Sequence, residues 1–179
     1  MDLEHLGRVL GDHVGAEGLP AGHAADASRL RSEPMTTIQV RPARAADVPD
    51  VERVVRRAFA PFTARTGIVP APRSTDWPTV VSALGAVVAL AGDRLVGVLV
   101  LWPHPDHLRI DTLAVDPEAQ GTGVGTALLG DADRVADGRP LRLSTNAGMA
   151  EARAWYLRHG FVEVGRWTED GYDRVHLER

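Results

Sequence analysis

The stretch LAVDPEAQGTGVGTALL, residues 113–129, decides the fold. It begins as an apolar run, passes through a turn that contains Gly121, Gly123 and Gly125, and continues with the residue spacing of a helix. Glycine permits positive φ and close approach of a ligand to the backbone, and the first turn of a helix leaves N–H groups without a partner in the helix. A strand, a glycine turn and a helix in this order predict an anion-binding site.

The glycine spacing excludes two common phosphate-binding motifs. A dinucleotide fold requires Gly-x-Gly-x-x-Gly, but Thr126 occupies the third glycine position counted from Gly121. A P-loop requires a lysine, and all 20 basic residues of the chain are arginine. The pattern that remains is Gln-x-x-Gly-x-Gly, formed by Gln120, Gly123 and Gly125.

The segments on either side of this stretch alternate between strand and helix patterns. Strands are predicted at 38–42, 86–90, 95–101, 108–115, 141–145, 161–167 and 172–177. Helices are predicted from an Asp47 cap through Phe59, at 76–84, from Val124 to a stop at Gly138, and at 150–158, with 61–72 as a loop or broken helix. Helices between strands, together with hairpins, predict an α+β (mixed α/β) fold.

The composition limits the functional classes. A length of 179 residues and a hydrophobic content of 44% predict one globular domain. The formal charge is −4, and acidic and basic residues are mixed along the chain, so no basic surface for nucleic acid or a membrane is expected. The absence of cysteine excludes disulfides and thiolate nucleophiles, and the absence of lysine excludes a Schiff base.

The chain also lacks the patterns of membrane insertion and secretion. No apolar stretch approaches the roughly 20 residues that cross a bilayer, and the start MDLEH does not resemble a signal peptide. A soluble, cytoplasmic protein is therefore expected. Residues 1–34 have only a weak helical pattern and are interpreted as a flexible N-terminal extension to a domain at 35–179.

The Gln-x-x-Gly-x-Gly pattern resembles the acetyl-CoA motif of the GNAT superfamily of N-acetyltransferases. The stretch AWYLRHGF at 154–161 resembles the family's second signature, a helix bearing a tyrosine followed by Gly-Phe, and VRPARAADV at 40–48 resembles its first strand and helix. The likeness spans residues 36–179. It implies a GNAT-like fold, with a central twisted, mostly antiparallel sheet of about six to seven strands flanked by about four helices.

The resemblance implies that acetyl-CoA binds at the glycine turn. Backbone amides at the start of a helix can hold a pyrophosphate, here those of Gln120, Gly121, Thr122, Gly123, Val124, Gly125 and Thr126. The family's pantetheine arm lies beside the preceding strand, which corresponds to Leu113, Ala114 and Val115. Many members have an asparagine seven residues before the tyrosine, where this chain has Met149. The asparagine of this chain, Asn146, comes earlier; it either contacts the cofactor or the substrate, or it is a turn residue.

Acetyl transfer from sulfur to nitrogen requires a neutral amine and a proton for the leaving thiolate. An amine with the pKa of lysine is neutral in only about one molecule in two thousand near pH 7, so a base or a water chain must take its proton. By resemblance, Tyr156 is the candidate general acid; the alternative is a core aromatic with a hydrogen-bonding hydroxyl. Asp111, expected by alternation to share a face with Leu113 and Val115, is the candidate base or else a structural ion-pair partner.

His104 and His107 stand three residues apart, but no further ligand accompanies them, so solvated loop histidines are expected rather than a metal site.

The predicted function is N-acetyl transfer from acetyl-CoA to a primary amine of a small molecule or a peptide. The alternatives are a catalytically silent acyl-CoA-binding sensor or partner module, and a structural interaction domain. Sheet edges leave a homodimer open, and the sequence does not identify the amine.

Overall fold

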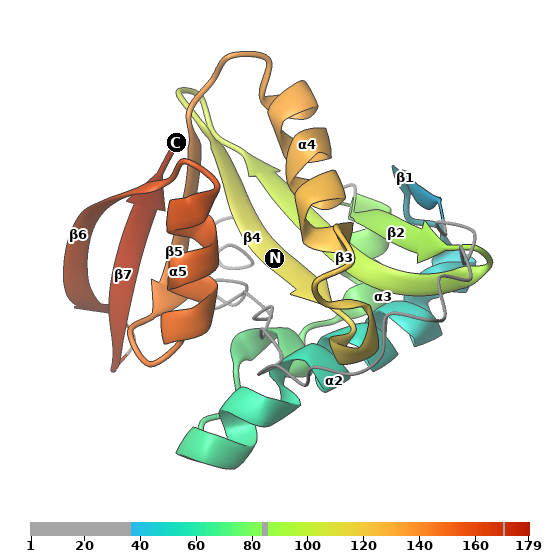
Figure 1. Ribbon diagram of the computed structural model, residues 1–179, viewed down its shortest axis with the longest axis horizontal. Helices are drawn as coiled ribbons and strands as arrows, with labels where there is room; N and C mark the ends of the chain where they lie inside the picture. Colours follow the sequence, from blue (N-terminus) through green and yellow to red (C-terminus); the bar gives the residue numbers. More distant parts are fainter. Residues whose placement is uncertain (1–36, 84–85, 170) are drawn as a thin grey trace, which may run out of the picture.

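The computed structural model describes residues 37–83, 86–169 and 171–179 (Figure 1). In this part of the chain a seven-stranded mixed sheet is flanked by four α-helices, which confirms the predicted fold class. The predicted extension at 1–34 lies outside the described residues. The strands are β1 (Ile38–Pro42), β2 (Val87–Ala91), β3 (Arg94–Pro103), β4 (Leu108–Val115), β5 (Leu141–Asn146), β6 (Val162–Glu169) and β7 (Tyr172–Glu178). The helices are α2 (Val48–Thr66), α3 (Trp77–Ala83), α4 (Val124–Ala136) and α5 (Ala150–Arg158), with short 3-10 turns η1 (Ala45–Asp47), η2 (Ala71–Ser74) and η3 (Pro117–Ala119).

The strand order is β1-β2-β3-β4-β5-β7-β6, and each neighbouring pair is antiparallel except β4 and β5. The parallel pair is joined only at Leu108–Leu141 and Arg109–Arg142. Both strands continue beyond these residues, so they part from each other, as Figure 1 shows. From Ile110 onward, the backbone edge of β4 that faces β5 is therefore not used by the sheet.

Helices cover the sheet on both faces, with α4 and α5 on one side and α2 and α3 on the other (Figure 1). Helix α4 packs closely because β3 carries Gly97, where a Cβ atom would lie 2.7 Å from Val124 Cγ1 and 2.9 Å from Leu128 Cδ1. Ala136 is the last buried residue of this helix, and the neighbouring Val135 is 37% exposed.

Helix α2 differs from expectation at both ends. Pro61 does not break it, and the helix ends only at Gly67, which has φ of 74°. The proline removes one hydrogen bond, but Phe59 and Phe62 on either side of it are buried, and their packing holds the continuous helix. Asp47 does not cap α2 through its side chain, because its carboxylate binds Arg41 at 2.7 and 2.9 Å.

None of the helices in the described residues is both long and apolar enough to cross a membrane.

Candidate active site

The glycine turn joins the end of β4 to the start of α4. Gly121 and Gly123 have φ of 76° and 90°, in the left-handed region that glycine adopts without strain. The first hydrogen bond of the helix runs from the Ala127 N–H to the Gly123 carbonyl at 2.9 Å, so the helix does not use the N–H groups of residues 124–126. A Cβ atom at Gly121 would meet nothing within 4 Å. The turn is open, and the amides of residues 124–126 are free to hold an anion, whereas the Gln120 N–H donates to the Pro117 carbonyl at 3.4 Å.

Polar side chains of the turn are directed back at the protein. Gln120 Nε2 contacts the Val115 carbonyl at 3.4 Å, and Thr122 Oγ1 donates to the Ala119 carbonyl at 2.7 Å. These side chains stabilise the shape of the turn, which leaves the backbone amides as its binding groups.

A buried carboxylate that sequence reasoning missed anchors the chain just before the turn. Asp116 is fully buried, and its Oδ2 lies 3.0 Å from Arg53 Nη1, 3.3 Å from Arg57 Nε and 3.2 Å from Arg94 Nη2. Its Oδ1 accepts the Glu118 N–H at 3.1 Å, at the start of η3. Because the three arginines come from α2 and β3, Asp116 ties the entrance of the turn to two distant elements.

Asp111 lies in a β-bulge, and its predicted orientation was wrong. The register of β3 with β4 shifts between Val100–Thr112 and Leu101–Ile110, so Asp111 has no partner on β3. The extra residue interrupts the alternation of side chains. As a result Asp111 lies beside Arg109, with 2.9 Å between its Oδ1 and Arg109 Nε, instead of on the α4 side with Leu113.

The environment of Asp111 changes its acidity. The side chain is fully buried, and among the described residues neither carboxylate oxygen accepts a hydrogen bond. Burial raises the pKa of Asp111 to about 7, against the opposing effect of the Arg109 charge. A carboxyl group with this pKa changes protonation state near neutral pH.

Tyr156 lies in the core beside α5's other aromatic residue. Its ring makes edge contacts with Trp155 and Phe161, each with 5.1 Å between ring centroids. Within the described chain the buried hydroxyl has no hydrogen-bond partner. Burial raises the pKa of Tyr156 well above its usual value of 10, so the phenol keeps its proton at neutral pH.

Asn146 ends β5 and forms a turn. Its Oδ1 accepts the Gly148 N–H at 2.9 Å, which is the local bond expected of a turn residue. The oxygen of Asn146 is thereby engaged before any ligand binds.

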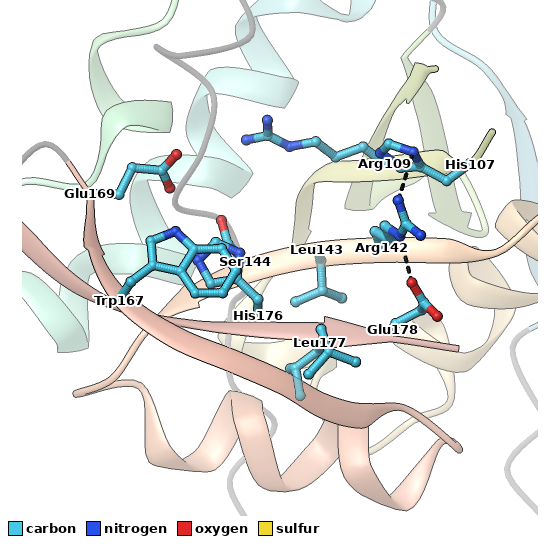
Figure 2. Close-up of a pocket in the computed structure, with 11 residues that line it drawn as sticks. His107, Arg109, Arg142, Leu143, Ser144, Trp167, Glu169, His176, Leu177 and Glu178 are labelled. Atoms are coloured by element: carbon cyan, nitrogen blue, oxygen red, sulfur yellow. Dashed lines mark hydrogen bonds and ion pairs between the residues drawn. The ribbon is translucent and has the colours of Figure 1, made fainter. Parts of the chain in front are cut away.

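A cavity of about 450 Å³ lies on the face of β5, β7 and β6 opposite α5 (Figure 2). One wall holds the Trp167 indole, stacked on His176 with ring centroids 3.4 Å apart and planes within 10°. The opposite wall holds Arg142, which binds Glu178 at 2.5 Å. Arg109 also lines the cavity, at the point where β4 and β5 part. The cavity and the parting strands therefore meet.

The histidines around the cavity do not form a metal site. His104 and His107 stack on each other with ring centroids 4.3 Å apart, and His107 Nδ1 lies 2.8 Å from Asp106. No cluster of three metal-ligating side chains occurs among the residues that the structure describes. The pKa of His176 is lowered to about 4 by burial and by the charges of Arg174 and Arg109, so this ring is neutral at pH 7.

Comparison with known proteins shows what this part of the chain is similar to. The family model described as the acetyltransferase (GNAT) domain matches residues 83–163. This match contains the parting strands, the glycine turn and Tyr156. Residues 83–163 are therefore similar to a GNAT acetyltransferase domain. A comparison with curated protein sequences found no match.

Solved structures share the fold of this chain. A protein of Desulfovibrio desulfuricans assigned to the GNAT family of acetyltransferases has 23% identity and a TM-score of 0.66, covering 80% of this chain and 98% of its own. The PaiA N-acetyltransferase of Thermoplasma acidophilum, in complex with coenzyme A, has 17% identity and a TM-score of 0.66, covering 78% and 98%. A Corynebacterium glutamicum structure described as histone acetyltransferase HPA2 and related acetyltransferase has 26% identity and a TM-score of 0.58, covering 79% and 94%.

Features of the structure fit acetyl-CoA, the donor that the resemblance to GNAT acetyltransferases implies. The open turn offers amides to a pyrophosphate. On β4 and α5, the buried polar atoms without a hydrogen-bond partner in the described residues are both oxygens of Asp111, Thr112 Oγ1, Trp155 Nε1 and Tyr156 Oη. Native proteins rarely leave such atoms unsatisfied, so a ligand that reaches between these elements would supply what they lack. Sequence reasoning did not single out Thr112.

Proposed function

We propose that the domain transfers the acetyl group of acetyl-CoA to a primary amine of a small molecule, or of a peptide, by direct attack of the amine on the thioester. The observation that carries this proposal is the parting of β4 and β5 directly after Arg109–Arg142. The glycine turn lies at one end of the parted strand and the cavity lies at the other. Donor and acceptor can therefore approach from different sides and meet between the strands.

The donor is held in two parts. The amides of residues 121–126, at the N-terminus of α4, bind the pyrophosphate, and Gly123 permits the close approach. The free backbone edge of Leu113, Ala114 and Val115 pairs with the pantetheine arm as a neighbouring strand would. From Val115 back to Arg109, six extended residues span about 20 Å, so an arm that follows β4 delivers the thioester next to the bulge.

The reacting groups are supplied by β4 and α5. Asp111, directly or through a water molecule, takes the proton of the attacking amine, and its pKa of about 7 suits this step near neutral pH. A bulge leaves its extra residue out of the ladder, so the Asp111 N–H is proposed to bind the oxyanion. Tyr156 gives its proton to the leaving thiolate. Asn146 is proposed to contact a substrate through its amide nitrogen, because its oxygen is engaged.

One observation favours the alternative of a catalytically silent acyl-CoA-binding module. Both Asp111 and Tyr156 are closed off from solvent, so a proton can reach Asp111 only through bound water or after Arg109 moves. A module of this kind would bind acetyl-CoA without transferring the acetyl group.

The two functions are separated by measuring binding and turnover on the same protein. Calorimetry with acetyl-CoA is expected to show binding, and thiol detection with a panel of primary amines is expected to show amine-dependent release of CoA. Binding without release for any amine would establish the silent module, whereas absence of binding would refute both. The cytoplasmic location expected from the sequence remains a prediction, and the homodimer that the sheet edges leave open is not tested.

A further inference from the structure

The cavity contains a cationic group, Arg109, whose two terminal nitrogens are not engaged by the described residues. Arg142 is held by Glu178 at 2.5 Å and by Asp106 at 3.1 Å. Arg109 is engaged differently, because its contact with Asp111 is made by Nε. Among the described residues, its two terminal nitrogens have no ion-pair or hydrogen-bond partner. The guanidinium presents these nitrogens to the cavity.

The position of Arg109 relates it to the acetyl group. It is the last residue at which β4 pairs with β5, and it stands two residues from the bulge at Asp111. In Figure 2 its guanidinium extends toward the side of the cavity that holds Trp167 and Glu169. An acceptor that binds Arg109 therefore lies next to the place where the thioester is proposed to arrive.

The remaining charges of the cavity do not select a cationic acceptor. Glu178 is paired with Arg142, and Glu169 lies 3.4 Å from Arg174 Nε. The two carboxylates are thus already matched with arginines. A planar guanidinium with two free N–H groups favours a carboxylate, which it binds with two parallel hydrogen bonds.

The opposite wall of the cavity is apolar and flat. The Trp167 indole leans over Gly165, where a Cβ atom would lie 2.3 Å from the ring, so only glycine at 165 allows this position. Trp167 is about half exposed, at 52%. One face of its indole stacks on the neutral His176 ring, and the exposed part is a surface on which an apolar or aromatic side chain can pack.

From these contacts we infer that the acceptor is an α-amino acid, bound through its carboxylate to the terminal nitrogens of Arg109, with its side chain against Trp167. This inference rests on the proposed function and names the acceptor class of the same site. In an α-amino acid the amine is one carbon from the carboxylate. Binding at Arg109 therefore holds the amine at the bulge, where its nitrogen forms a bond to the thioester carbon as the C–S bond breaks. The proton of the amine leaves toward Asp111, and CoA leaves as a thiol with the proton of Tyr156.

The test compares amines that differ only in the carboxylate. With acetyl-CoA present, kcat/KM is measured for L-phenylalanine and phenethylamine, L-tryptophan and tryptamine, and L-leucine and 3-methylbutylamine. The carboxylate should increase kcat/KM on the order of ten- to hundredfold in each pair, as expected for hydrogen bonds to a charged group. O-phosphoethanolamine is included to distinguish a phosphate from a carboxylate.

Variants show whether Arg109 causes the preference. Arg109→Gln should reduce the ratio within each pair to about one, and Arg109→Lys, which keeps a charge beside the buried Asp111, should retain the fold with a reduced ratio. Arg134→Gln, at an exposed arginine of α4, is the matched control and should behave as the natural chain does.

The outcomes separate this inference from the proposed function. Acetylation of the decarboxylated amines alone, or a preference that persists in Arg109→Gln, overturns the inference and leaves acetyl transfer intact. A higher kcat/KM for O-phosphoethanolamine than for the amino acids would overturn the inference that Arg109 binds a carboxylate. CoA release with none of the amines, despite bound acetyl-CoA, counts against the proposed function itself.

Discussion

At the scale of single residues, Tyr156 has a hydroxyl that the fold does not need. The hydroxyl is buried and has no hydrogen-bond partner in the described part of the chain, and a buried polar group in that state destabilises the protein. Tyr156→Phe is therefore expected to leave Tm unchanged or raise it. If the phenol protonates the leaving thiolate, kcat should fall about 10²-fold or more, with little change in acetyl-CoA affinity.

The two roles weighed for Tyr156 predict opposite results in this experiment. If the hydroxyl is structural, Tyr156→Phe should lower Tm, and kcat should fall only as far as the folded fraction falls. Unchanged turnover in a stable Tyr156→Phe protein would remove the catalytic role.

Asp111 connects activity and stability through one ionisation. As a base it must be ionised, so kcat/KM should rise with pH through the pKa of about 7, and Asp111→Asn should lose this dependence. The pKa is raised from 3.8, so the folded state holds the proton more tightly than the unfolded chain. Asp111 therefore lowers stability as pH rises from about 4 to 7, and the whole penalty is present above 7.

Thermal unfolding tests this linkage independently of catalysis. Asp111→Asn cannot ionise, so its Tm should exceed that of the natural chain at pH 8.5 and approach it at pH 4.5. Identical pH profiles of activity in the two proteins would assign proton transfer to a water chain without the carboxylate.

At the scale of elements, the start of α4 depends on one backbone conformation. Gly123 has φ of 90°, and its nearest neighbour for an added Cβ is Ile38 at 3.8 Å, so alanine there would be strained by conformation and not by contact. Gly123→Ala should lower stability by about 1–2 kcal/mol and raise the KM for acetyl-CoA by shifting the amides of the turn.

Gly130, on the same helix, provides the matched control. It is exposed, it lies inside α4, and an added Cβ would meet nothing within 4 Å. Gly130→Ala should stabilise the protein by about 0.5–1 kcal/mol and leave the KM for acetyl-CoA unchanged. Equal KM values for the two variants would show that the turn does not position the donor.

Local pattern predicted most elements because their residues carry the period of a strand or a helix. The strand ending at Val115 and the helix beginning at Val124 were found in this way. The bulge at Asp111 was not, because register depends on the partner strand, and one extra residue reverses the face of a side chain. The helix through Pro61 was missed for a related reason: the packing of Phe59 and Phe62 outweighs the missing hydrogen bond.

At the scale of the whole molecule, the candidate site joins parts of the chain that no local pattern connects. The cavity draws on the start of β4 and on β5, β6 and β7. Arg109 and Trp167 line it together because β5 and β7 lie between β4 and β6 in the sheet. The sequence predicted the donor motif, which is contiguous, but it could not predict an acceptor surface assembled by sheet order.

The arginines around Asp116 fasten the donor turn to the rest of the fold. Arg53 and Arg57 come from α2, Arg94 comes from β3, and all three contact the fully buried carboxylate. Breaking a fully buried ion pair costs about 3–5 kcal/mol. Here the arginines are between 28% and 49% exposed and stay hydrated after the carboxylate is removed. Asp116→Ala should therefore cost less, about 1.5–3 kcal/mol, as for hydrogen bonds to charged groups.

Urea unfolding and donor kinetics together measure what Asp116 contributes to the whole domain. Asp50→Ala is the control, because Asp50 also pairs with Arg53 but is 57% exposed, and such a pair is worth at most about 1 kcal/mol. Asp116→Ala should also raise the KM for acetyl-CoA and leave the relative kcat/KM of different amines unaltered, since the cavity lies at the far end of β4 and on β5, β6 and β7. A loss of stability no greater than that of Asp50→Ala would mean that the turn is held by its own backbone bonds, and that α2 and β3 do not position the donor.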